Sequence, residues 1–315
     1  MQNVFILFGF TFLSFTANAH DLALNWKPEP EFGGFYEALR SNLYDKGELK
    51  INILPGGAGQ PVAQMVAGKK ASFGIASADE VILARAQGAK IVAIFAVYQN
   101  DPQGFMVHEE RGIKSLKELF QTEGTIALQK GLPYTLWLEK KYAPVKANIV
   151  PYTGGIASFI QNPKFSQQCF ITSEPLAARR EKINPKTFLI SESGFNPYLT
   201  VVIAHEDLLK ADPNLVKNFV DSTRLGWVSY LAHPEATNQA MQKLYPSLDL
   251  ETFNEASRIQ KPFIETEGAK KSIIGAMNKE RWQTLYGQML ELKLVKPGMD
   301  ANQFFRSDFL TVPSK

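Results

Sequence analysis

The residues of this chain that could carry out covalent or metal chemistry are few and stand apart. None of its four histidines lies within metal-ligand spacing of another, and no CxxC or HExxH motif occurs. The single cysteine, Cys169, lies in the apolar stretch QQCFITS, which is typical of a buried strand rather than of an activated nucleophile. The segment GGAGQP lacks the Lys-Ser/Thr of a phosphate-binding loop, so it is a strand-to-helix turn, a backbone anion site, or both. These residues predict a protein that is not an enzyme and holds no cofactor or metal.

Polar and aromatic side chains instead follow six strand-like runs at the point where each run ends. In open α/β sheets, ligands bind outside the carboxyl ends of the strands, so these residues together predict one binding cleft. Each of these residues could instead have an ordinary structural role. Ser77, Asp79 and Thr153 can cap helices, and Trp26 can pack in a core. The candidate ligand-binding residues at or near strand ends are Trp26, Ser77, Asp79, Tyr98, Gln99, Gln129, Thr153, Gly154 and Glu174, with Tyr198 just before a further strand.

The elements that must position these side chains alternate between strand and helix patterns. Val62, Met65 and Val66 have helical spacing, and the pairs Ser77/Glu80 and Ser115/Glu118 match the spacing of a capping box. From residue 212 onward the pattern is almost wholly helical. The alternation predicts an α/β fold with largely parallel sheets. The strand-like runs are LAL, LKINIL, SFGIAS, KIVAIFAV, TIALQ, ANIVPY, QCFITS, KTFLIS and LTVVIAH.

Composition limits the classes of partner. The chain has 315 residues, of which 45% are hydrophobic, enough for two lobes with ordinary cores. Its formal net charge of +3 is small and dispersed, which argues against nucleic acid as a partner. A single cysteine excludes an internal disulfide, so the fold must depend on its hydrophobic core.

The first residues have the features of an export signal. Residues 1–19 are uncharged and mostly apolar, and they end in Ala17-Asn18-Ala19, so we expect a signal peptide that is cleaved before His20. The alternative is an uncleaved anchor, but the apolar run is shorter than the roughly 20 residues that span a bilayer. The residue directly after the predicted cleavage site is His20 and not a cysteine that could carry a lipid, so the sequence predicts a soluble periplasmic protein.

Three segments, taken in order, resemble a known family. LNWKPEPEFGGFYEAL, GGAGQPVAQMVAGKKASFGIASADEVILARAQGAKIVAIFAVYQNDPQGFMV and TSEP are similar to the substrate-binding proteins of ABC importers in the thiamin-pyrimidine-synthase-like (NMT1-like) group, which also includes sulfonate-, nitrate- and riboflavin-binding proteins. The resemblance is close over residues 20–205 and looser beyond. It implies a type II periplasmic-binding fold, in which two α/β lobes joined by two crossing strands close around a ligand. Residues 20–108 and 196–315 would form one lobe, and residues 109–195 the other.

The same resemblance implies roles for three residues. Trp26 would stack on a flat ligand, and Tyr36 would lie near the same wall. Glu174, in TSEP, would accept hydrogen bonds from a ligand with N–H donors, such as the pyrimidine precursor of thiamin. Helix N-termini alone can bind an anion, so an alkanesulfonate, taurine or nitrate is the alternative ligand, and riboflavin is a third.

An enzymatic alternative has the same fold. The yeast-type pyrimidine synthase carries a CCCFC stretch for iron, whereas this chain has only Cys169-Phe170, so that chemistry lacks its ligands. The resemblance therefore implies a monomer that delivers a small molecule to the transmembrane subunits of an ABC permease.

Overall fold

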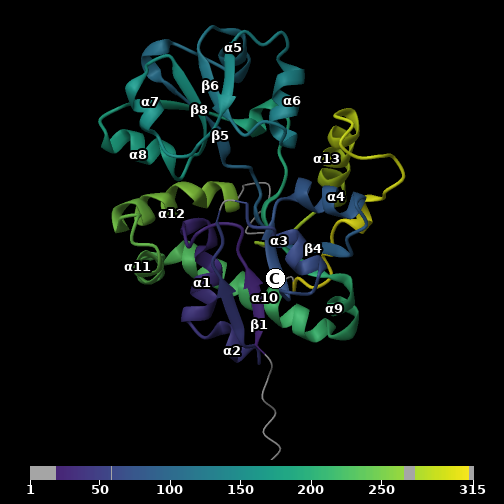
Figure 1. The fold of residues 1–315 in the computed structure, drawn as a ribbon. Coiled ribbons are helices and arrows are strands. Elements are labelled where there is room, and N and C mark those ends of the chain that lie inside the picture. The colour runs from purple at the N-terminus through teal and green to yellow at the C-terminus, as the bar shows by residue number, and fades with distance from the viewer. Residues whose placement is uncertain (1–18, 58, 266–273, 312–315) are drawn as a thin grey trace, which may run out of the picture.

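Two five-stranded sheets form two lobes in the computed structural model, which describes residues 19–57, 59–265 and 274–311 (Figure 1). The predicted signal peptide, except Ala19, lies outside the described residues. The strand order is β2-β1-β3-β10-β4 in the first lobe and β7-β6-β8-β5-β9 in the second. The first sheet contains β1 (His20–Ala23), β2 (Ile51–Leu54), β3 (Phe73–Ala76), β4 (Ile91–Tyr98) and β10 (Leu199–His205); the second contains β5 (Gln103–His108), β6 (Thr125–Leu128), β7 (Asn148–Pro151), β8 (Phe165–Phe170) and β9 (Pro185–Leu189).

Each sheet has one strand that runs against its two neighbours. β10 is antiparallel to β3 and β4, and β5 is antiparallel to β8 and β9. Gln103, at the start of β5, pairs with Phe170 at the end of β8, and Leu199, at the start of β10, pairs with Tyr98 at the end of β4. The chain therefore passes between the lobes at the carboxyl edges of both sheets, and these edges face each other. The predicted two-lobed α/β fold is confirmed.

The first boundary between the lobes differs from the prediction. Residues 103–108 were expected in the first lobe, but they form β5 of the second sheet. The change occurs within residues 99–102, where Pro102 has no N–H for a ladder and the Asp101 carboxylate accepts the N–H of Gln103 at 2.7 Å. The chain returns to the first lobe through residues 194–198. We call residues 99–102 the first crossing and residues 194–198 the second crossing.

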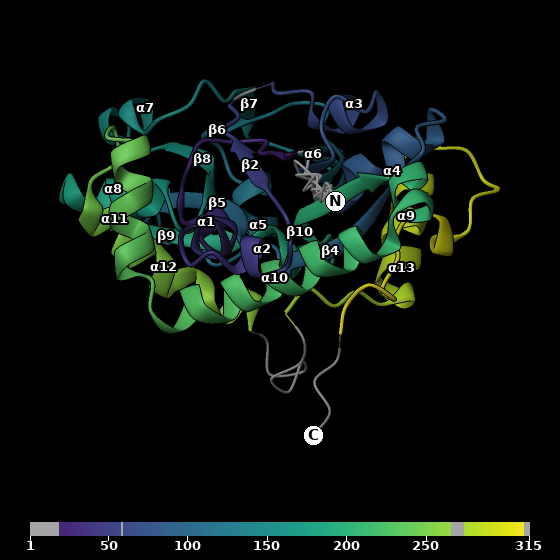
Figure 2. The ribbon, with the colours of Figure 1, turned by 90° about the horizontal axis from the view of Figure 1, so that it is seen from below.

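Helices cover both sheets, and the predicted helical tail is confirmed in α10 to α13. Figure 2 shows α10 running across the first lobe. None of the described helices is both long and apolar enough to cross a membrane. The first lobe carries α1 (Gly33–Arg40), α2 (Leu43–Lys46), α3 (Val62–Ala67), α4 (Ala78–Ala86), α9 (Glu206–Ala211), α10 (Pro213–Ala232), α11 (Glu235–Leu244), α12 (Leu250–Ile264) and α13 (Lys279–Glu291); the second carries α5 (Leu116–Gln121), α6 (Pro133–Lys141), α7 (Ala157–Gln161) and α8 (Glu174–Arg180).

The Gly-Gly pair near the N-terminus serves helix packing. A Cβ at Gly33 would stand 2.0 Å from the ring of Tyr230, and a Cβ at Gly34 would stand 2.2 Å from the ring of Trp227, both on α10. Gly226 on α10 similarly lies against the backbone of α1. Only glycine allows the two helices to approach this closely. The packing of α1 on α10 fixes the start of α1, and with it the segment that precedes it.

Candidate ligand site between the lobes

The segment after β1 places Trp26 at the carboxyl edge of the first sheet. The backbone oxygen of Trp26 accepts the N–H of Gly56 at 2.9 Å, which ties this segment to the loop after β2. A Cβ at Gly56 would stand 2.1 Å from the backbone oxygen of Leu24, so glycine is required for the contact. The Trp26 side chain is 39% exposed, and its indole N–H donates to the Glu29 carboxylate at 3.2 Å. The aromatic face is thereby held on the surface of the lobe.

Two carboxylates follow Trp26 closely. The pKa of Glu29 is raised to about 7, mainly by burial and also by the charge of Glu174 in the other lobe, against the hydrogen bond from Trp26 and the charge of Lys27. Burial and the charges of Glu29 and Glu174 raise the pKa of Glu31 well above its usual range. Two acids of the first lobe therefore lie within range of the charge of one acid of the second.

Glu174 is fixed by its own lobe. It is the first residue of α8, its Oε1 accepts the hydroxyl of Tyr152 at 2.8 Å, and its Oε2 accepts the backbone N–H of Phe170 at 2.8 Å. Burial raises the pKa of Glu174, and these two hydrogen bonds act against that rise. Because both oxygens are engaged, the carboxylate is held in one orientation.

An aromatic contact also joins the two lobes. The ring of Tyr98, at the end of β4, meets the ring of Phe170 edge-to-face at 5.9 Å. The Tyr98 hydroxyl donates to Gln260 at 2.6 Å, and the amide of Gln260 donates to the backbone oxygen of Pro30 at 2.9 Å. Tyr98 is fully buried, so it supports the segment that carries the two acids. It is not an exposed wall.

The site combines acidic side chains with aromatic rings. Among the described residues, none of the ion pairs includes Glu29, Glu31 or Glu174. The nearby Lys27 lies instead against the ring and hydroxyl of Tyr245. In their ionised form these acids can accept hydrogen bonds from N–H groups or balance a positive charge, and they repel an anion. We call these residues the interlobe cluster: Trp26, Glu29, Glu31, Tyr152, Phe170 and Glu174.

Other predicted residues of the first sheet edge lie at the start of α4. Ser77 and Glu80 form the predicted capping box, with Ser77 Oγ accepting the N–H of Glu80 and the Glu80 carboxylate accepting the N–H of Ser77. Asp79 is nearly buried, and burial raises its pKa. Of the two roles open to Ser77, ligand contact and helix cap, the structure shows the helix cap.

In the second lobe, three predicted residues lie on the exposed rim. The N–H of Gln129 donates to the side chain of Gln168 at 2.6 Å, and the same Gln168 oxygen accepts the hydroxyl of Tyr134 at 2.7 Å. Thr153 and Gly154 are exposed after β7, where Gly154 has a φ of +87° that favours glycine. They form the turn next to Tyr152, which belongs to the cluster.

Three further predicted residues, Tyr36, Gln99 and Tyr198, also lie outside the cluster. Tyr36 packs in the core of the first lobe, and burial raises its pKa to about 12. Gln99 donates to the backbone oxygens of Ala96 and Ala276, and Tyr198 lies under the side chain of Arg281. Position near a strand end suggested the cleft for Gln99 and Tyr198, and the family resemblance did so for Tyr36. The structure turns Tyr36 into the core, and the other two serve the crossings.

Four members of the cluster were not among the candidates. Glu29 and Glu31 stand in KPEPEF directly after Trp26, and this concentration of acid beside an aromatic residue was a usable signal. Tyr152 and Phe170 end or follow predicted strands, so the strand-end rule covers them as well. Only the crossing of the chain between the lobes brings these four residues together.

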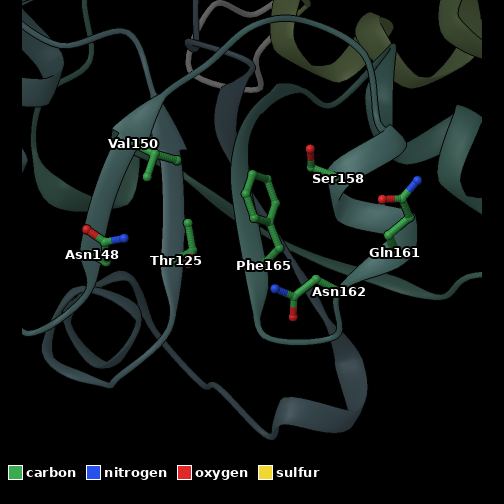
Figure 3. A pocket seen from close by; sticks show the side chains of 7 residues that line it. All are labelled: Thr125, Asn148, Val150, Ser158, Gln161, Asn162 and Phe165. Carbon is green, nitrogen blue, oxygen red and sulfur yellow. The ribbon is translucent and has the colours of Figure 1, made fainter.

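Two hollows in the described part of the molecule lie elsewhere. One of about 350 Å³ is in the second lobe, where Figure 3 shows Thr125, Asn148 and Phe165, which begin β6, β7 and β8. It is therefore at the edge of the sheet opposite the interlobe cluster. The other, of about 370 Å³, lies between α13 and the two crossings. Within the described ranges, no three His, Cys, Asp or Glu side chains form a group that could hold a metal ion.

Comparison with known proteins gives the family. The model of the family described as NMT1/THI5 like matches residues 29–237, which include most of both lobes. The chain belongs to this family. This NMT1/THI5-like chain is also 23% identical to the riboflavin-binding protein RibY of Chloroflexus aurantiacus, an alignment that covers 92% of this chain and 85% of RibY.

Solved structures share the fold at low identity. The periplasmic aliphatic sulphonate binding protein SsuA from Escherichia coli superimposes with a TM-score of 0.68, at 16% identity and 95% coverage of both chains. The desulfurization enzyme DSZB superimposes with a TM-score of 0.62, at 12% identity, covering 92% of this chain and 97% of the enzyme. The chain thus has the periplasmic-binding-protein fold, which serves both binding proteins and an enzyme, so its function must be argued from its own site.

Proposed function

We propose that this protein is the periplasmic solute-binding component of an ABC importer, and that its ligand is a flat, nitrogen-containing ring related to the pyrimidine precursor of thiamin. The observation that carries the proposal is the position of Glu174, held by Tyr152 and Phe170 and close to Glu29 and Glu31 of the other lobe. A ring amine between the lobes would donate to these carboxylates and relieve their mutual repulsion.

The rings of the cluster suit a flat ligand. The exposed face of Trp26 offers one stacking surface, and Phe170 lies across the lobe boundary. Because both lobes contribute contacts, the ligand itself would favour the closed form, which is the form that a transmembrane permease would recognise. The protein acts in this proposal as a monomer.

The proposal excludes bond chemistry. The one cysteine, Cys169, is buried in β8, and burial raises the pKa of its thiol well above the usual range. A thiol in that state is a poor nucleophile. Binding and release are then the whole function, without a cofactor.

Riboflavin is the second candidate, favoured by the similarity to RibY. Its ring system is also flat, but it offers fewer N–H donors for three carboxylates. A sulfonate or nitrate is disfavoured because it would add negative charge to the cluster.

A thermal-shift screen separates these candidates. A ligand that binds only the folded state raises the melting temperature, so the thiamin pyrimidine, riboflavin, taurine and nitrate are compared at equal concentration. We expect the largest rise with the pyrimidine. A rise with taurine or nitrate alone would overturn the proposed ligand class, and a rise with riboflavin alone would favour the second candidate.

A further inference from the structure

Arg281 of α13 lies against both crossings, although it is far from either in sequence. Its Nε donates to the backbone oxygen of Asn196 at 2.9 Å, and its Nη2 donates to that of Pro197 at 2.9 Å, both in the second crossing. Its Nη1 donates to the backbone oxygen of Gln99 in the first crossing. One side chain therefore binds carbonyl groups of both connections between the lobes.

Asn196 adds a second link between the crossings. Its Oδ1 accepts the backbone N–H of Asp101 at 2.9 Å and Nη2 of Arg281 at 3.1 Å. Its Nδ2 donates to the side-chain oxygen of Asn100 at 3.0 Å. The side-chain amide of Asn196 thus contacts the first crossing twice and Arg281 once.

The position of Arg281 is itself fixed. Asn278 caps α13 by accepting the N–H of Arg281 at 2.8 Å, and the N–H of Asn278 donates to the hydroxyl of Tyr198 at 3.1 Å. The guanidinium lies 3.9 Å from the centre of the Tyr198 ring. Tyr198 belongs to the second crossing, so the first turn of α13 is anchored on the segment that Arg281 binds.

The first crossing also contains a buried acid, Asp101, which the charge of Arg281 affects. Asp101 is fully buried, its Oδ1 accepts the N–H of Gln103, and its Oδ2 has no hydrogen-bond partner among the described residues. Burial raises the pKa of Asp101 well above its usual range, and the charge of Arg281 acts against that rise. The cation at this position therefore favours the ionised form of the buried acid.

We propose that Arg281 is a positioning residue for ligand capture, which joins the two crossings into one hinge and limits how far the lobes open. Opening of the lobes changes the backbone torsions of the crossings. With its planar fork bound to carbonyls of both crossings, Arg281 makes these changes occur together and opposes independent twisting of each connection. Arg281 itself belongs to the hinge and is not a member of the interlobe cluster.

The test measures the distance between the lobes in the ligand-free protein. Spin labels are placed on Lys243→Cys in the first lobe and Glu181→Cys in the second, both exposed positions, while the native Cys169 is buried. Arg281→Lys keeps the charge but loses the planar fork, so we expect a broader distance distribution shifted to longer values. A label pair within the first lobe, Lys243→Cys with Lys46→Cys, should be unaffected.

A matched control and a second variant decide the outcome. Arg306→Lys makes the same change at an arginine paired with Asp308 on the surface, and it should leave the distribution unchanged. If Arg281→Lys fails to fold, Asn196→Ala tests the same coupling and should also broaden the distribution. An interlobe distribution equal to that of the parent protein, even with a lowered melting temperature, would show that Arg281 is only a packing residue and overturn the proposal.

Discussion

At the scale of single residues, the tryptophan after β1 has the clearest role to test. Removing its ring in Trp26→Ala takes away a stacking surface and apolar area, so we expect the affinity for a flat ring ligand to fall by roughly 1–3 kcal/mol, or about 5- to 150-fold. Trp26→Phe is the matched control, because it keeps a flat ring and should retain most of the affinity. Calorimetric titration measures both. Equal affinity of Trp26→Ala and the parent protein would remove the stacking role.

Glu29 gives a prediction about pH. Its pKa in the folded protein is about 7, raised from 4.5, so the folded state keeps a proton that the unfolded state loses between these values. The stabilisation is therefore complete below pH 4.5 and is lost as the pH rises through about 7. In the parent protein, the free energy of unfolding should therefore fall between pH 5 and pH 8. In Glu29→Gln this fall should be smaller, by on the order of 1–3 kcal/mol.

Urea unfolding at the two pH values measures this difference. Glu110→Gln, at an exposed position of the second lobe, is the control and should leave the pH dependence unchanged. The buried Glu31 and Glu174 act in the same direction, so the pH dependence is reduced rather than abolished in Glu29→Gln. An identical pH dependence in Glu29→Gln and the parent would contradict the role of burial at this site.

At the scale of elements, the contact between α1 and α10 can be tested through its glycines. Gly34→Ala places a methyl group against the Trp227 ring, so we expect a loss of about 1–3 kcal/mol of stability. Gly287→Ala, in α13, is the matched control because nothing lies within 4 Å of its Cβ, and it should be neutral or stabilising. Chemical denaturation measures both variants. A loss of the same size in the two variants would show that close packing on α10 is not the cause.

The local elements were predictable where a short pattern decides them. The capping box of Ser77 and Glu80 starts α4 as predicted. At α5 only half of the predicted box forms: Ser115 accepts the N–H of Glu118, but the Glu118 carboxylate accepts the N–H of Lys114. Spacing thus predicts the helix start, while the partner of a flexible carboxylate depends on the local backbone.

At the scale of the whole molecule, the sequence predicted two lobes but not where the chain first changes lobe. Residues 99–102 are too few to distinguish a turn within one sheet from a crossing between two, because strand pairing depends on residues distant in sequence. The same limit applies to the site. Trp26 and Glu174 were predicted from their positions, whereas Arg281 in the hinge comes from the helical tail, where no local pattern indicates contact with residues 99 and 196.

The arrangement of the two lobes also determines how the acids of the interlobe cluster would select a ligand. Neither lobe holds all three acids. Burial raises the pKa of each, and the charge of Glu174 adds to the rise at Glu29 and Glu31, so every further negative charge at this site is unfavourable. In the proposed function, a ligand that offers N–H donors would thus join the lobes, while an anion would drive them apart. This property distinguishes the proposed ligand from sulfonates better than the fold can, since the fold is shared.

Glu174→Gln tests this selectivity most directly. Calorimetric titration of the thiamin pyrimidine and of taurine is compared between this variant and the parent protein. Loss of a charge-assisted hydrogen bond should weaken binding of the pyrimidine by roughly 10- to 100-fold, while the reduced negative charge should not weaken binding of taurine. Unchanged or tighter binding of the pyrimidine by Glu174→Gln, or binding of taurine alone by the parent protein, would contradict recognition by carboxylates between the lobes.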